Sequence, residues 1–173
     1  MPTPDLSHLH DLERIEVMMV CLGNICRSPM AAAVLATRAR DLQGKLIEVT
    51  SSGTSSWHVG QGPNPPSRRV WERAGYSHEH IATQITSDRI AQSDLILVMD
   101  SSNHAHVLEI AKPDDQKKVF FLRDFDPFAE DLDVPDPYGL GDHAFERVLE
   151  MVERSVDGLL NALGVANPSD TSR

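Results

Sequence analysis

A mostly apolar run at residues 14–20 leads directly into a short loop, and a helix-forming segment at residues 30–40 follows. An uninterrupted apolar run of this length is typical of a strand buried on both faces of a parallel sheet. The loop has the sequence C-L-G-N-I-C-R, so Cys21 opens it and Arg27 closes it. A strand, a tight loop and a helix in this order predict an α/β fold with its ligand site at the loop.

The residue types in this loop suit a bound phosphoryl group. Backbone N–H groups in a concave loop before a helix form an anion-binding nest. Arg27 offers a planar fork for two phosphate oxygens and for the charge of a transition state. Beside this positive potential, Cys21 is expected to be a thiolate and a nucleophile. The alternatives are a small buried hydrophobe at Cys21 and a surface ion pair at Arg27.

Two motifs resemble the low-molecular-weight protein tyrosine phosphatase family of bacterial type. They are C-L-G-N-I-C-R-S-P at residues 21–29 and D-P-Y at residues 136–138. Further matches in family order are Ser51, residues 57–60 and residues 97–100. The resemblance implies hydrolysis of phosphotyrosine through a phosphocysteine intermediate, without a metal or cofactor. It also implies the strand order 2-1-3-4.

A phosphate monoester needs its leaving oxygen protonated, so a general acid is required. Asp-Pro occurs at Asp126-Pro127 and again at Asp136-Pro137. The resemblance selects Asp136, which two flanking prolines stiffen, and leaves Asp126 as a turn residue.

The resemblance also implies several binding and supporting residues. Trp57 and Tyr138 would form aromatic walls, and Ser51 and His80, with Asp100, would support the loop. Gly139 stands where many members have a second tyrosine, and Thr83 stands where an arginine is common. The full set of predicted substrate- or phosphate-binding residues is Leu22, Gly23, Asn24, Ile25, Cys26, Ser28, Trp57 and Tyr138.

Four of these residues have an additional expected role. Gly23 and Asn24 are expected to adopt the positive φ of a tight turn. Ser28 is a candidate N-cap, placing Pro29 at the first helical position, and a hydroxyl donor to a leaving thiolate. Cys26 either packs in the core or pairs reversibly with Cys21, which the family resemblance allows.

The remaining pattern predicts one three-layer α/β domain at residues 14–164, with a four-stranded parallel sheet and helices on both faces. A flexible leader at residues 1–13 and a polar tail at residues 165–173 would flank it. Gly44 is the predicted end of the first helix. Strands are expected at residues 14–20, 46–50, 95–99 and 119–122, and helices at residues 30–40, 67–74, 86–93, 103–111 and 145–163.

Composition limits the function classes and partners. Sixteen basic against 26 acidic residues give a net charge of −10, which disfavours nucleic acid and anionic membranes as partners. The two cysteines share one loop, so a disulfide scaffold is not indicated, and the eight histidines lack the spacing of a zinc site. No signal peptide or membrane span is apparent, which predicts a cytoplasmic monomer or weak dimer, with leaderless export left open.

Three other functions fit the same loop. An arsenate reductase would need relay cysteines, and none follows Cys26. A protein-arginine phosphatase would be crowded by Ile25, while Tyr138 favours an aryl group. A phosphate-binding module without chemistry would not need Cys21, Arg27 and Asp136 together.

Overall fold

The computed structural model describes residues 2–165, so the expected C-terminal tail lies, apart from Val165, outside the described residues. Its centre is a parallel four-stranded sheet with the order β2-β1-β3-β4. This confirms both the predicted number of strands and the order that the resemblance implied. The strands are β1 Arg14–Cys21, β2 Leu46–Gly53, β3 Leu95–Val98 and β4 Val119–Phe121.

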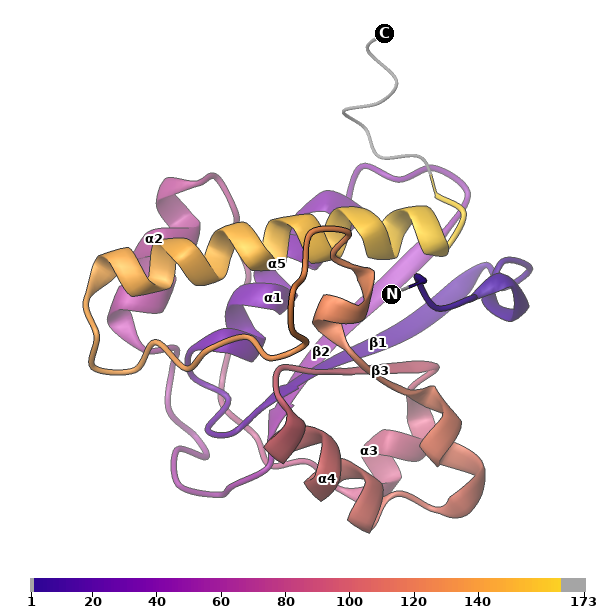
Figure 1. Cartoon of the computed structure of the whole chain (residues 1–173), viewed down its shortest axis with the longest axis horizontal. Coiled ribbons are helices and arrows are strands. Elements are labelled where there is room, and N and C mark those ends of the chain that lie inside the picture. Colours follow the sequence, from indigo (N-terminus) through magenta and orange to yellow (C-terminus); the bar gives the residue numbers. More distant parts are fainter. Residues whose placement is uncertain (1, 166–173) are drawn as a thin grey trace, which may run out of the picture.

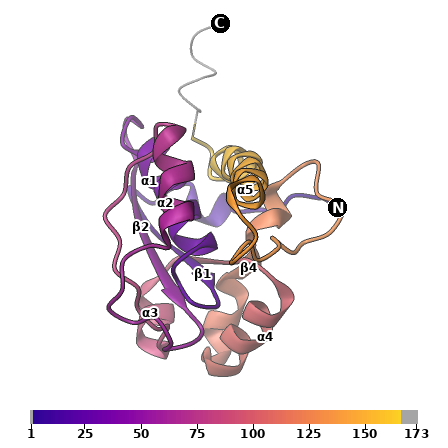
Figure 2. The same ribbon diagram turned by 90° about the vertical axis from the view of Figure 1, so that its left-hand side faces the viewer.

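Helices cover both faces of this sheet, and Figures 1 and 2 show the resulting three layers. Helices α1, α2 and α5 lie on one face, and α3 and α4 lie on the other. The helices are α1 Arg27–Ala39, α2 Pro65–Arg73, α3 Ser87–Gln92, α4 Ser101–Ile110 and α5 Asp142–Ala162, with short 3-10 helices η1 Ser7–Leu9, η2 Pro113–Lys118 and η3 Leu122–Phe125.

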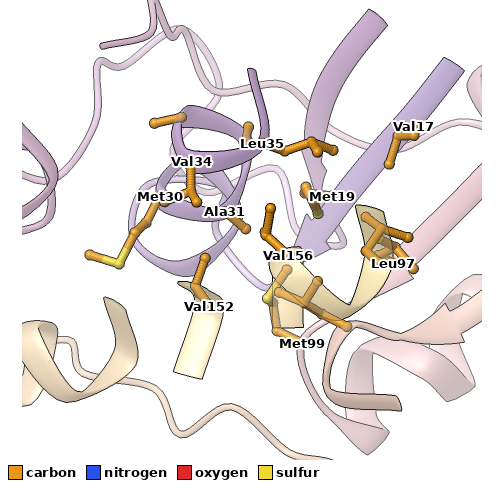
Figure 3. Packing of buried hydrophobic residues seen from close by; sticks show 14 of the residues in the cluster. Val17, Met19, Met30, Ala31, Val34, Leu35, Leu97, Met99, Val152 and Val156 are labelled. Carbon is orange, nitrogen blue, oxygen red and sulfur yellow. The ribbon is translucent and has the colours of Figure 1, made fainter. Parts of the chain in front are cut away.

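Strand β1 is central in the sheet, and its side chains alternate between two cores. Val17 and Met19 pack in the larger core with α1 and α5, which Figure 3 shows from close by. Met18 and Val20 pack on the opposite face, against α3 and α4. Burial on both faces explains why this strand is mostly apolar rather than alternating.

The N-terminal boundary of the core differs from the expected domain boundary at residue 14. Leu6 and Leu9 are 1% and 5% exposed and belong to the larger core. His10 adds a hydrogen bond from its ring to the carbonyl oxygen of Ala162 (2.8 Å) at the end of α5. Segment 6–10 therefore packs with the domain; the flexibility of residues 1–13 stays a prediction.

The first helix begins and ends earlier than predicted. It starts at Arg27, with Cys26 as its N-cap residue, and its C-cap is Arg40. The predictions of Ser28 as N-cap and of Gly44 as the end of the helix are therefore wrong. Gly44, with a φ of +78°, instead turns the chain into β2.

Within residues 2–165, no helix is both long and apolar enough to cross a membrane.

Candidate active site

The loop at residues 21–27, called the cysteine loop below, joins the end of β1 to the start of α1. Because β1 lies between β2 and β3, the loop lies beyond the carboxyl end of a central strand, where ligands bind in open α/β sheets. Cys21 is the last residue of β1 and is 2% exposed. The fold therefore places the cysteine where sequence analysis expected a ligand site.

Asn24 holds the shape of the cysteine loop. Its φ of +57° is the single positive value of a non-glycine residue among residues 2–165. Its Nδ2 donates to the hydroxyls of Ser28 (2.7 Å) and Ser51 (2.9 Å), and its Oδ1 accepts from the backbone N–H of Thr83 (3.0 Å). One buried side chain thus ties the loop to α1, β2 and the segment before α3.

His80 contacts the loop from outside. Its Nε2 lies 2.6 Å from the carbonyl oxygen of Asn24, which can only accept, so Nε2 is the donor. Burial lowers the pKa of His80, which favours the neutral ring. Its Nδ1 then accepts from the Ser51 hydroxyl at 3.5 Å, so both predicted supporting residues meet at Asn24.

Gly23 leaves space for the His58 ring and does not supply a positive φ. It has no positive φ, so that prediction is wrong. A Cβ built there would lie 2.9 Å from Cδ2 of His58, closer than side-chain carbons normally approach. Gly23 therefore lets the His58 ring lie directly against the cysteine loop.

Ser28 is buried directly behind Cys21. Its Oγ accepts from Asn24 and lies 3.0 Å from Sγ of Cys21, so its own proton is available to the sulfur. This contact explains why Ser28 does not cap the helix: its hydroxyl is directed at the cysteine instead. Cys26, 5% exposed, lies beside them, and burial raises the pKa of its thiol to about 12.

Arg27 is 3% exposed and fixed by contacts on one side. Its Nη1 donates to Oδ2 of Asp100 (2.7 Å) and to the carbonyl oxygen of Val134 (2.9 Å). Burial opposes the charge, but Cys21, Asp100 and Asp136 outweigh it and raise the pKa of Arg27 above its ordinary value. The guanidinium is thus a permanently charged group with a fixed plane.

Asp136 faces Arg27 from the long loop before α5. Its Oδ2 lies 3.8 Å from Nη2 of Arg27, and its Oδ1 accepts from the backbone N–H of Tyr138 (3.1 Å). Its side chain is 47% exposed. The other Asp-Pro aspartate, Asp126, is fully buried against Arg154 and does not line this site.

These residues meet in a cavity of about 180 Å³. Trp57 and Tyr138 are 71% and 59% exposed, which is unusual for aromatic side chains and suits cavity walls. A larger hollow between α1 and β2 contains no cysteine. The cavity-lining residues are Cys21, Leu22, Gly23, Ile25, Cys26, Arg27, Trp57, His58, Asp136 and Tyr138.

The lining partly matches the predicted set. Asn24 and Ser28 were predicted to bind substrate or phosphate, but both are fully buried behind the cavity and shape it. His58 lines the cavity and was missed; its place after Trp57 in a glycine-rich loop was the available signal. The contact between Arg27 and the Val134 carbonyl was also missed, because backbone contacts leave no mark in residue types.

No group of three or more His, Cys, Asp or Glu side chains within residues 2–165 is arranged to hold a metal ion. The cavity brings together the thiol of Cys21, the guanidinium of Arg27 and the carboxyl of Asp136, with Cys26 and His58 beside them. Together they can bind an oxyanion, attack it and transfer a proton.

Comparisons with known proteins agree with this geometry. The sequence model of the low molecular weight phosphotyrosine protein phosphatases matches residues 16–168. The chain is 42% identical over 151 residues to a low molecular weight protein-tyrosine-phosphatase of Streptomyces coelicolor, covering 85% of this chain and 92% of that protein. It is 40% identical over 149 residues to low molecular weight protein-tyrosine phosphatase A of Mycobacterium tuberculosis, covering 84% and 89%.

Solved structures agree as well. The crystal structure of a protein tyrosine phosphatase from Entamoeba histolytica has a TM-score of 0.82 at 33% identity, covering 87% of this chain and 97% of that one. The residues matched by the family model, 16–168, include the cysteine loop and Asp136. This chain belongs to the low molecular weight protein tyrosine phosphatase family.

Proposed function

We propose that the protein hydrolyses phosphotyrosine in proteins through a phosphocysteine intermediate. The observation that carries this proposal is the single cavity in which Cys21, Arg27 and Asp136 meet between two exposed aromatic side chains. A thiol nucleophile, a phosphate-binding cation and a proton donor are the three groups that this reaction needs.

In the first step, the Cys21 thiolate attacks phosphorus in line with the leaving oxygen. The S–P bond forms as the P–O bond breaks, and Asp136 gives its proton to the departing phenolate. Arg27 and the loop N–H groups bind the equatorial oxygens, where charge is spread in the transition state. The contacts of Nη1 with Asp100 and Val134 fix the guanidinium before substrate arrives.

In the second step, the Asp136 carboxylate takes a proton from water, and the water oxygen attacks phosphorus. The S–P bond breaks and inorganic phosphate leaves. The sulfur departs as a thiolate, and the Ser28 hydroxyl, 3.0 Å from Sγ, donates a hydrogen bond to it. Asn24 occupies the Ser28 oxygen as a donor, which aims the hydroxyl proton at the sulfur.

The cavity favours an aryl phosphate over the alternatives. Ile25 lines it beside Cys21 and narrows the space for a guanidinium-borne phosphate, while Trp57 and Tyr138 offer stacking surfaces. The sequence after Cys26 contains no cysteine to relay electrons in an arsenate reductase. No observation favours either alternative function.

We also propose that the protein works in the cytoplasm, as a monomer or weak dimer, on a phosphotyrosine protein. The mechanism requires a reduced Cys21. Reduced thiols persist in the cytosol.

The test is turnover of a phosphotyrosine peptide and of a phosphoarginine peptide by three variants. Cys21→Ser should abolish phosphate release, and Asp136→Asn should lower kcat by about 100-fold or more. The control is Asp114→Asn, since Asp114 is exposed and outside the cavity; it should keep full activity. Full turnover by Cys21→Ser, or preference for phosphoarginine, would contradict the proposal.

A further inference from the structure

The position of Asp136 is set by its neighbours in the chain rather than by its own side chain. Within residues 2–165, its carboxylate has two polar contacts, the N–H of Tyr138 and, at 3.8 Å, Arg27. Val134 and Pro137 are buried on either side of it, whereas Pro135 and Asp136 are exposed. Asp136 therefore lies in a short segment stiffened by two prolines, residues 134–137, called the arm below. The placement of its carboxyl depends on how residues 133–134 are anchored.

The backbone of Val134 is anchored to the centre of the molecule. Its N–H donates to the carbonyl oxygen of Met99 (2.6 Å) at the end of β3, and its carbonyl oxygen accepts from Arg27 (2.9 Å). Two hydrogen bonds to one residue fix its position along the arm. These two hydrogen bonds do not fix the backbone torsion angles of Asp133, the preceding residue.

Other contacts hold Asp133. Its Oδ1 accepts from the backbone N–H of Ser101 (2.9 Å) and its Oδ2 from the Ser101 hydroxyl (3.4 Å) at the first turn of α4. A carboxylate is favoured there by the helix dipole. The carbonyl oxygen of Asp133 accepts from Nη1 of Arg123 (3.0 Å). Both ends of Asp133 are thus held by separate elements.

Arg123 is unusual because it is a buried cation aimed at the base of this arm. Its side chain is 7% exposed. Its Nη2 lies 3.7 Å from the fully buried carboxylate of Asp126, which Arg154 also contacts at 3.3 Å. Asp126, together with Asp131 at 3.6 Å from Nη1, therefore holds the Arg123 guanidinium against the Asp133 carbonyl.

We propose that Arg123 and Asp133 are positioning residues for the Asp136 carboxyl, acting through the backbone at residues 133–134. The inference rests on the proposed function, in which Asp136 protonates the leaving group. Displacement of a reacting group by about 1 Å costs on the order of 100-fold in rate. Loosening this anchor should therefore weaken proton transfer while leaving Cys21 and Arg27 in place.

Dependence of rate on the leaving group distinguishes this role from a purely structural one. A strongly basic phenolate needs a proton from Asp136 to leave, whereas the weakly basic 4-nitrophenolate leaves with little help. A misplaced acid therefore lowers kcat/KM mainly for phenyl phosphate. General damage to the fold or to the cysteine loop lowers it equally for both substrates.

The experiment measures kcat/KM for a series of aryl phosphates from phenyl to 4-nitrophenyl. Asp133→Ala should lower kcat/KM about tenfold for phenyl phosphate and less than about twofold for 4-nitrophenyl phosphate. Inhibition by inorganic phosphate should not change, because Arg27 keeps its contact with Asp100. Asp133→Asn keeps an acceptor oxygen for Ser101 and should recover most of the loss.

Arg123→Met should steepen the leaving-group dependence in the same way. If it unfolds the protein, the exposed Asp133 still carries the test, because its side chain can be shortened without opening the core. Arg154→Met is the matched control, since it removes the other cation of Asp126 but no contact with residues 133–134. It should leave the leaving-group dependence unchanged.

The outcomes separate the two proposals. Asp136→Asn should itself steepen the dependence, and adding Asp133→Ala to it should steepen it no further. Suppose that Asp136→Asn steepens the leaving-group dependence, but that folded Asp133→Ala lowers kcat/KM equally for all substrates or does not lower it. The positioning role is then wrong. If Asp136→Asn leaves it unchanged, Asp136 is not the general acid, and both proposals fail.

Discussion

At the scale of single residues, the cysteine loop is held in shape by its own side chains. The single side chain of Asn24 makes hydrogen bonds with Ser28, Ser51 and Thr83. Asparagine tolerates the left-handed backbone at this position better than most residues because its short polar side chain bonds locally. The loop N–H groups are thus oriented before an anion binds, and preorganised donors stabilise transition-state charge without a reorganisation cost.

The two cysteines of the loop should differ in reactivity. Burial first, and then the nearby Cys21 and Asp136, raise the pKa of Cys26 from 9.0 to about 12. Burial, the largest of these causes, remains in a Cys21→Ser variant, so iodoacetamide should label Cys26 very slowly in the folded protein up to about pH 10. In urea, labelling should follow the ionisation of an ordinary thiol, and mass spectrometry measures both rates.

The same shift has a consequence for stability. A thiol that ionises near pH 9.0 when unfolded and near pH 12 when folded adds stability below pH 9.0, and this is lost as the pH rises towards 12. In the labelling experiment, half-maximal labelling of Cys26 near pH 9 in the folded Cys21→Ser variant would contradict a raised pKa for this thiol.

Sequence reasoning located Cys21, Arg27 and Asp136 for different reasons. Cys21 and Arg27 belong to one local segment, so their spacing already predicts a shared site. Asp136 is distant in sequence; its flanking prolines favoured a fixed carboxyl, and the family resemblance selected it over Asp126. Burial of Asp126 depends on Arg123 and Arg154, a tertiary arrangement that the two Asp-Pro pairs do not reveal.

At the scale of elements, one aspartate joins a helix start to the site. Oδ1 of Asp100 caps α4 by accepting from the N–H of Asn103 (2.8 Å), while its Oδ2 binds Arg27. The helix therefore begins at Ser101, two residues before the predicted start at Asn103. The apolar pattern alone could not reveal this boundary, because the first turn of α4 is polar and the cap decides where it starts.

Helix α5 packs closely against η3, and Gly158 lies at the point where the two backbones meet. A Cβ added at Gly158 would overlap the carbonyl oxygen of Phe125. Gly158→Ala should therefore force the helix away from η3 and lower the free energy of unfolding by about 3 kcal/mol. Urea unfolding followed by circular dichroism measures the change.

The control for this substitution is Gly62→Ala. Gly62 has open space around its Cβ position and no positive φ, so alanine there should be neutral or slightly stabilising. Equal stability of the two alanine variants would show that α5 and η3 do not approach as closely as described. The helical pattern of residues 145–163 predicted α5 well, but not that one of its residues must lack a side chain.

At the scale of the whole molecule, the alternation of strands and helices was enough to predict a single α/β layer structure. Its strand count follows from the apolar runs, whereas the order β2-β1-β3-β4 came from the family resemblance. The contribution of the N-terminal segment was not predictable in the same way. Residues 1–13 are mostly polar and contain two prolines, and a run of leucines at 6, 9 and 12 is too short to indicate which of them are buried.

The buried leucines of this segment should contribute to global stability. Leu9→Ala removes a side chain that is 5% exposed in the larger core, and should lower the free energy of unfolding by about 2–4 kcal/mol. Leu6→Ala should have a similar effect, because Leu6 is 1% exposed in the same core. Leu12→Ala is the matched control: Leu12 is 38% exposed and should change stability by less than about 1 kcal/mol.

Activity provides the second half of this test. The segment is absent from the lining of the cavity, so kcat/KM of the folded Leu9→Ala variant should equal that of the unmodified protein at low temperature. The variant should lose activity on heating earlier, in step with unfolding measured by circular dichroism. If Leu9→Ala unfolds at the same urea concentration as Leu12→Ala, residues 6–9 behave as a leader outside the cooperative domain, and the structural boundary belongs at residue 14 after all.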